Sequence, residues 1–74
     1  MDITYRIDKD ILYIAVEGRI DASNAAEAEE KIFSIRNDNQ GKYTVVDADK
    51  LEYISSAGLR VILRLRKEGF SWWL

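Results

Sequence analysis

Residues 43–69 have the sequence YTVVDADKLEYISSAGLRVILRLRKEG. The first six of these residues are rich in β-branched and aromatic side chains, which indicates a strand from Tyr43 to Ala48. The pair Ser55-Ser56 follows, and serine is a preferred residue at the start of a helix. Apolar residues then recur at helical spacing until Gly69, which is suited to end a helix. This stretch therefore predicts a strand and then a helix, as in an α/β fold.

The predicted second helix is amphipathic. Apolar residues recur on one side, and basic residues gather on another and in the last turns, where they complement the helix dipole. One face is expected to carry Leu59, Ile62, Leu63 and Arg66, and the other Arg60, Arg64 and Lys67.

Two further strands are predicted near the amino terminus. Ile3, Tyr5 and Ile7 alternate with polar residues, which is the period of a strand with one buried face. Residues 11–16 are apolar at odd and even positions alike, which predicts a central strand buried on both faces. The polar residues 8–10 lie between these two runs, so we expect a hairpin.

A first helix is predicted from about Ser23 to Arg36, in a segment rich in alanine and glutamate. Asn24, followed three residues later by Glu27, resembles a capping box. A strand, a helix and a strand in one sheet imply parallel neighbours joined by a right-handed crossover. The buried face is expected to carry Ala25, Ala28, Ile32 and Ile35, and the solvated face Glu27, Glu29, Glu30 and Lys31.

The apolar tail that follows Gly69 has two interpretations. Residues 70–74 read FSWWL, and they either open a fourth strand or form a disordered end. Two adjacent tryptophans need a place to bury, because exposed apolar surface of that size marks a contact.

Composition excludes several classes of function. The chain has no cysteine and no histidine, so disulfides, thiolate nucleophiles, imidazole bases and the usual zinc sites are absent, and an enzyme is not expected. A net charge of −2 without basic runs offers no footprint for nucleic acid or for a membrane surface. We expect no cofactor and no metal, because Asp21, Asp47 and Asp49 are only a weak signal for a divalent ion.

The sequence also gives an expectation for location. No stretch is apolar over the about 20 residues that span a bilayer. The first residues, MDIT, lack the basic and apolar regions of a signal peptide. A cytoplasmic location is therefore expected.

Two motifs carry a family resemblance. Residues 45–63, VVDADKLEYISSAGLRVIL, resemble the signature of the anti-sigma factor antagonist family, the STAS domain. Residues 18–23, GRIDAS, resemble that family's first strand-to-helix turn. The resemblance implies an α/β fold with a mixed sheet of about four strands and helices packed on one face. It also implies that residues 1–74 are a single STAS domain that lacks the usual C-terminal strand and helix.

The resemblance implies a site at the start of the second helix. In the family, an anti-sigma factor that is also a serine kinase phosphorylates a serine or threonine two residues before a glycine, which corresponds to Ser56. Ser55 stands where many members carry an aspartate, and whether it is an alternative acceptor stays open. The residues expected to bind the partner are Asp21, Ser55, Ala57, Gly58, Leu59 and Arg60.

Physical chemistry supports two interpretations of this site. Unpaired amides at a helix start can contact a phosphate, while about −1.5 to −2 added charges near Asp21 would weaken a close protein contact. We therefore expect an electrostatic switch at a serine N-cap. Alternatively, the serine pair is only a cap, Gly58 only permits close packing, and the Asp21 carboxylate is itself an N-cap.

Three functions follow from these observations. The first is an anti-sigma factor antagonist that a serine phosphatase resets. The second is a STAS scaffold or ligand-sensing module without the switch. A nucleotide-binding protein is third, because no GxxxxGK loop is present. A homodimer that buries the sheet edge and the Phe70-Trp72-Trp73 cluster is also expected.

Overall fold

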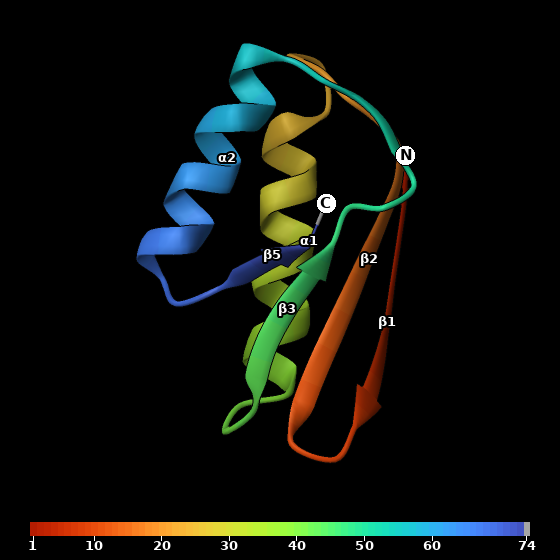
Figure 1. The fold of residues 1–74 in the computed structure, drawn as a ribbon. Helices are drawn as coiled ribbons and strands as arrows, with labels where there is room; N and C mark the ends of the chain where they lie inside the picture. Colours follow the sequence, from red (N-terminus) through yellow and green to blue (C-terminus); the bar gives the residue numbers. More distant parts are fainter. Residues whose placement is uncertain (74) are drawn as a thin grey trace.

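The computed structural model describes residues 1–73, and their side chains as far as Trp72 (Figure 1). This part of the chain forms a mixed five-stranded sheet and two helices. The elements are β1 (Asp2–Asp8), β2 (Ile11–Ile20), α1 (Ala25–Asp38), β3 (Tyr43–Asp47), β4 (Leu51–Ile54), α2 (Ser56–Lys67) and β5 (Ser71–Trp73).

The long strand β2 organises the sheet. It pairs antiparallel with β1, parallel with β3 along its first half, and parallel with β4 along its second half. The register shifts between Gly18 and Arg19, where the partner strand changes, and Gly18 has a φ of +97° that favours glycine. β5 pairs parallel with β3 and confirms the strand interpretation of the tail. The sequence predicted a sheet of about four strands, and the structure adds β4. This strand was not predicted because it is short and lies directly before the serine pair.

Both helices lie on the same face of the sheet, as predicted (Figure 1). Leu12, Ile14 and Val16 of β2 point into this interface and are fully buried. The alternate residues Tyr13 and Ala15 on the opposite face are only half-buried. The prediction that this strand is buried on both faces was wrong, because no helix among residues 1–73 covers the second face.

The edge strand β1 is more exposed than its pattern indicates. Ile3, Tyr5 and Ile7 pair in register with the buried residues of β2 and therefore share the helix-side face. Nevertheless Tyr5 is 54% exposed and Ile7 is 44% exposed. The period-2 pattern identified the face correctly but could not show how far the helices extend over it.

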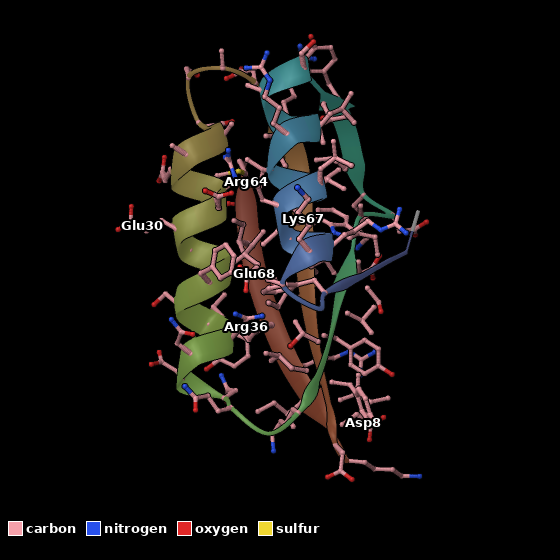
Figure 2. All side chains as sticks on the ribbon, turned by 90° about the vertical axis from the view of Figure 1, so that its left-hand side faces the viewer. Asp8, Glu30, Arg36, Arg64, Lys67 and Glu68 are labelled. Carbon is pink, nitrogen blue, oxygen red and sulfur yellow. The ribbon has the colours of Figure 1, made fainter. Side chains whose placement is uncertain are left out.

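The two helices are joined by an ion pair. Ala25, Ala28 and Ile32 of α1 are buried, as predicted. Glu29 is not simply solvated, because its Oε2 lies 2.6 Å from Nε of Arg64 on α2. Figure 2 shows Arg64 on the side of α2 that faces α1, whereas Glu30 points away.

The buried face of α2 differs from the predicted apolar face. Gly58, Val61 and Leu65 pack on the sheet, whereas Leu59 is 50% exposed and Leu63 is 59% exposed. Leucine and isoleucine occur on two adjacent sides of this helix, so spacing alone did not identify the side that packs. Two large apolar side chains thus remain on the surface.

Phe70 is buried within its own chain. Its ring packs edge-on against Phe33 at a centroid distance of 5.5 Å, and the guanidinium of Arg36 lies 4.6 Å from its centroid. Arg36 also donates a 2.6 Å hydrogen bond to the carbonyl of Glu68 beside it (Figure 2). Burying such a ring contributes about 1.5–3 kcal/mol. The expectation that Phe70 needs a second chain was therefore wrong, and the Trp73 side chain lies outside the described residues.

Candidate functional site

Two neighbouring strand ends bring the two motifs together. β4 runs parallel to the end of β2, so both strands finish at the same edge of the sheet. The backbone N–H of Ser55 donates to the carbonyl of Ile20 at 2.8 Å. Asp21 is the next residue after Ile20, so the turn before α1 and the start of α2 are adjacent.

Ser55 is the residue that caps α2. Its φ of −84° and ψ of 176° are extended, and its Oγ accepts a 3.3 Å hydrogen bond from the backbone N–H of Gly58. Serine and aspartate are about equally good in this position, which explains how Ser55 can replace the family's aspartate. The expectation that Ser56 is the N-cap was wrong, because Ser56 is the first residue of the helix.

Ser56 is exposed in the first turn of α2. Its hydroxyl makes no hydrogen bond with any residue whose side chain is described. The amides of Ser56 and Ala57 belong to the unpaired group at a helix start, where the dipole favours negative charge. The site therefore offers an accessible hydroxyl next to backbone groups that can contact an anion.

Gly58 allows α2 to start close to the sheet. A Cβ at this position would lie 2.5 Å from Cγ1 of Ile54 and 2.9 Å from Cγ2 of Ile20. Either distance requires a neighbouring atom to move. Gly58 is buried, so within the candidate site it shapes the surface without presenting a side chain.

Asp21 is held in place by its own turn. Its Oδ1 accepts hydrogen bonds from Oγ of Ser23 and, at 2.9 Å, from the backbone N–H of Ser23. These two bonds, that from the hydroxyl first, lower the pKa of the Asp21 carboxyl below its usual value. The carboxylate therefore stays ionised near neutral pH. It contributes a fixed negative charge to the turn beside Ser55.

The side chain of Asn24 also forms hydrogen bonds within this turn, and it does not form the predicted capping box. Its Oδ1 accepts from the backbone N–H of Asp21 at 2.9 Å, and its Nδ2 donates to the carbonyl of Arg19 at 3.0 Å. No side-chain capping bond reaches the first amides of α1. The prediction of a capping box between Asn24 and Glu27 was wrong, because the side-chain amide of Asn24 bonds to the backbone of the turn that precedes α1 instead.

An apolar surface adjoins Ser56. Leu59 and Leu63 follow Ser56 at intervals of three and seven residues, which places all three on one side of α2. Arg60 is exposed beside them. We call Ser56, Leu59, Arg60 and Leu63 the α2 surface. The predicted site omitted Leu63, although its spacing from Ser56 was a usable signal.

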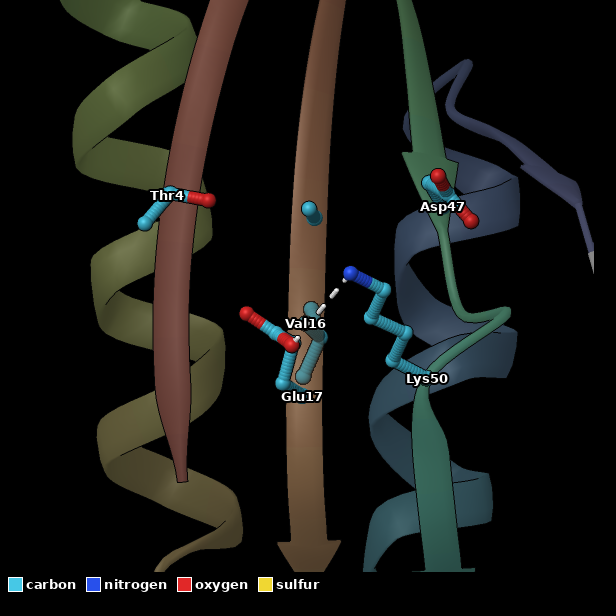
Figure 3. A pocket seen from close by; sticks show the side chains of 6 residues that line it. Thr4, Val16, Glu17, Asp47 and Lys50 are labelled. Carbon is cyan, nitrogen blue, oxygen red and sulfur yellow. Dashed lines mark ion pairs between the residues drawn. The ribbon is translucent and has the colours of Figure 1, made fainter.

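The uncovered face of the sheet has a small hollow of about 180 Å³, which is lined by Thr4, Ala15, Val16, Glu17, Asp47 and Lys50 (Figure 3). Lys50 and Glu17 lie across it as an exposed ion pair with an N–O distance of 3.9 Å. Asp47 accepts from the backbone N–H of Asp49 at 2.9 Å and thereby stabilises a turn. Among residues 1–72, no three carboxylates are close enough to hold a metal ion.

The family follows from a comparison with known proteins. The model of the STAS domain family matches residues 2–69. The chain belongs to the STAS domain family. The resemblance predicted from residues 18–23 and 45–63 is thereby confirmed.

Several proteins are similar to this STAS domain. BtrV of Bordetella bronchiseptica, whose name assigns it to the anti-sigma factor antagonists, is 34% identical over 58 residues. This match covers 78% of the chain and 49% of BtrV. The chain thus corresponds to about half the length of that relative.

Two solved structures share the fold. An anti-sigma factor antagonist from Mycobacterium paratuberculosis has a TM-score of 0.82 at 21% identity, covering 96% of this chain and 64% of the other. The unphosphorylated anti-sigma factor antagonist SpoIIAA has a TM-score of 0.65 at 15% identity, covering 90% and 62%. At such identities the likeness concerns the fold alone.

In this STAS domain the predicted site residues form one continuous region. Ser55, Ser56 and Ala57 start α2, Leu59 and Arg60 continue its exposed side, and the Asp21 turn adjoins them. Neither helix formed by residues 1–73 is both long and apolar enough to cross a membrane.

Proposed function

We propose that this STAS domain is an anti-sigma factor antagonist controlled by phosphorylation of Ser56. With Ser56 unmodified, the α2 surface binds an anti-sigma factor that is also a serine kinase, and a sigma factor is released for transcription. Phosphorylated protein dissociates from the kinase, and a serine phosphatase restores binding. The domain is a substrate and a binding module.

The observation that carries this proposal is that Ser55 and Ser56 have different roles at the start of α2. Ser55 provides the helix cap, so the exposed hydroxyl of Ser56 is not needed to hold α2 in place. A modification of Ser56 can therefore change the surface while the fold persists. The names of similar proteins also support an anti-sigma factor antagonist, since BtrV and both solved structures are described in these words.

Electrostatics account for the release step. A phosphate at Ser56 would contact the unpaired amides of the first turn and would lie one helical turn from Arg60. Those contacts keep the phosphorylated domain folded. The same phosphate adds charge to the α2 surface, whose apolar residues Leu59 and Leu63 must lose water when the partner binds. Desolvation of that charge, together with the ionised Asp21 nearby, opposes the complex.

Phosphorylation mapping tests this proposal. The protein is incubated with its anti-sigma factor kinase and ATP, and the phosphate is located by mass spectrometry of peptides. One phosphate is expected at Ser56, absent from Ser56→Ala and retained in Ser55→Ala. A phosphate at Ser55 in the parent protein would make Ser55 the acceptor. No phosphate at either serine would favour a STAS scaffold without the switch.

A further inference from the structure

The strand β1 forms a long free edge of the sheet. Among residues 1–73 it pairs only with β2, and all seven of its residues follow one register without a bulge. Natural proteins usually protect such an edge with proline, lysine, a bulge or a covering element. The strand Asp2–Asp8 contains neither proline nor lysine, and six of its seven residues are exposed. Figure 1 shows this edge on the side of the sheet farther from α2.

The backbone of β1 directs hydrogen-bonding groups to this edge. The carbonyl of Asp10, directly before β2, accepts a hydrogen bond from the amide of Tyr43 on β3. Backbone groups alternate in direction along a strand, so the odd-numbered residues of β2 bond to β1. Their partners in register are the even-numbered residues of β1. The N–H and C=O groups of Ile3, Tyr5 and Ile7 therefore point away from β2 and can pair with a further strand.

The side chains on the open face of β1 alternate in charge. Asp2 and Arg6 carry opposite charges four residues apart, with Thr4 midway between them. The guanidinium of Arg6 lies 4.1 Å from the ring centroid of Tyr13 on β2, which keeps it on this face. A negative and a positive group at equal distances from a central residue match an inverted copy of the same strand, as a two-fold interface requires.

Charge selects one antiparallel register for two copies of β1. Opposite charges that face each other across two strands are stabilising, and like charges are destabilising. With a two-fold axis at Thr4, Asp2 lies opposite the partner's Arg6, and apolar residues of the helix-side face lie opposite apolar residues. An axis at Tyr5 would place Asp2 opposite the partner's Asp8, and an axis at Arg6 would place two arginines opposite each other. The register centred on Thr4 avoids both repulsions.

We propose that two copies of this chain pair antiparallel along β1 around a two-fold axis at Thr4, which joins their sheets into one. The backbone groups of Ile3 and Tyr5 exchange hydrogen bonds with those of the partner's Tyr5 and the partner's Ile3. The ion pair between Asp2 and Arg6 forms twice. The α2 surface of each copy stays free, because β1 is the edge farther from α2 (Figure 1). The dimer is therefore independent of the proposed switch.

Sedimentation equilibrium tests the dimer. One strand pair is smaller than a standard interface, so monomer and dimer should interconvert as the concentration changes. Arg6→Asp should raise the dissociation constant by at least about tenfold, because both ion pairs become like-charge pairs. Lys31→Asp, at an exposed position of α1, makes the same charge change and should associate like the parent. A parent that stays monomeric at every concentration, or equal weakening by both substitutions, would overturn the proposal.

Exchange of the two charges tests which residues face each other. Asp2→Arg combined with Arg6→Asp restores opposite charges across the axis, so the double variant should recover the association that Arg6→Asp alone loses. Circular dichroism checks that each variant is folded. A folded double variant that associates as weakly as Arg6→Asp would contradict the pairing of Asp2 with Arg6.

Disulfide cross-linking tests the position of the axis, and the chain has no cysteine that would interfere. The two facing Thr4 residues form a non-hydrogen-bonded pair, with Cα atoms about 4.5 Å apart, which is within the range of a disulfide. Thr4→Cys should therefore give a covalent dimer under mild oxidation. Asp8→Cys is the control, because in this register it lies about 27 Å from its copy. Equal cross-linking of the two variants, or none in Thr4→Cys, would overturn the proposal.

Discussion

The starts of the two helices use their polar side chains differently. Before α1, the side chains of Asp21 and Asn24 are engaged with the backbone or side chains of their own turn. Before α2, Ser55 alone supplies the cap, and the hydroxyl of Ser56 stays unused at the surface. One helix start is therefore held by hydrogen bonds from two side chains, while the other has an exposed hydroxyl that takes no part in its cap.

A charge at the start of α2 should have the largest effect. Ser56→Glu is expected to weaken binding to the anti-sigma factor kinase by at least about 30-fold, because a charge desolvated without a partner costs about 2 kcal/mol or more. Ser34→Glu, at an exposed serine of α1, is the control and should bind like the parent. Surface plasmon resonance gives both affinities. Similar losses in the two variants would remove the distinction between the helices.

Crowding at Gly58 should have the next largest effect. Gly58→Ala is expected to destabilise the fold by about 1–3 kcal/mol, since the new methyl group overlaps Ile54 and Ile20. For a domain of this size each kcal/mol lowers the melting temperature by about 4–8 °C. Thermal unfolding followed by circular dichroism measures the change. An unaltered melting temperature would mean that α2 does not start as close to the sheet as described.

Removal of the α2 cap should have a smaller effect. Ser55→Ala is expected to cost about 1 kcal/mol of folding free energy, while Ser55→Asp should keep or slightly raise stability through the helix dipole. Urea unfolding of the two variants and the parent provides the comparison. If alanine and aspartate destabilise equally, Ser55 does not act as the cap.

A pH dependence at the α1 turn should be the smallest effect. Because the pKa of Asp21 is lowered in the folded protein, its ionised form contributes stability above the usual value of 3.8, and this contribution is lost as pH falls through the folded-state pKa. Asp21→Asn should therefore be less stable than the parent at pH 6, and the difference should shrink towards pH 2.5. A difference that is constant over this range would contradict the assigned hydrogen bonds.

Much of the fold could be predicted because local patterns and the packing agree. The hairpin around residues 8–10, the strand at residues 43–48 and the buried alanines of α1 follow from spacing and residue type. Properties that depend on several elements at once could not be predicted. The side of α2 that packs is one example, because Leu59 and Val61 are equally apolar and only the position of the sheet decides between them.

The proximity of the two motifs could be predicted from the sequence, but the hydrogen bonds of their side chains could not. The motifs singled out Ser56 and Asp21. The N-cap of α2 is Ser55 and not Ser56, because the first backbone hydrogen bond of the helix is accepted by the carbonyl of Ser55. Asn24 favours a cap by its residue type, yet the carbonyl of Arg19 and the amide of Asp21 are better placed to bond it. Such competition between nearby partners is invisible in a sequence pattern.

The central claim is that modification of Ser56 controls partner binding without unfolding the domain. The most direct test is the affinity of one preparation for the anti-sigma factor kinase before and after stoichiometric phosphorylation at Ser56, with circular dichroism recorded on both forms. We expect identical spectra and a dissociation constant raised by at least about 30-fold. Unchanged affinity of the phosphorylated form, or a loss of affinity that accompanies unfolding, would contradict the claim.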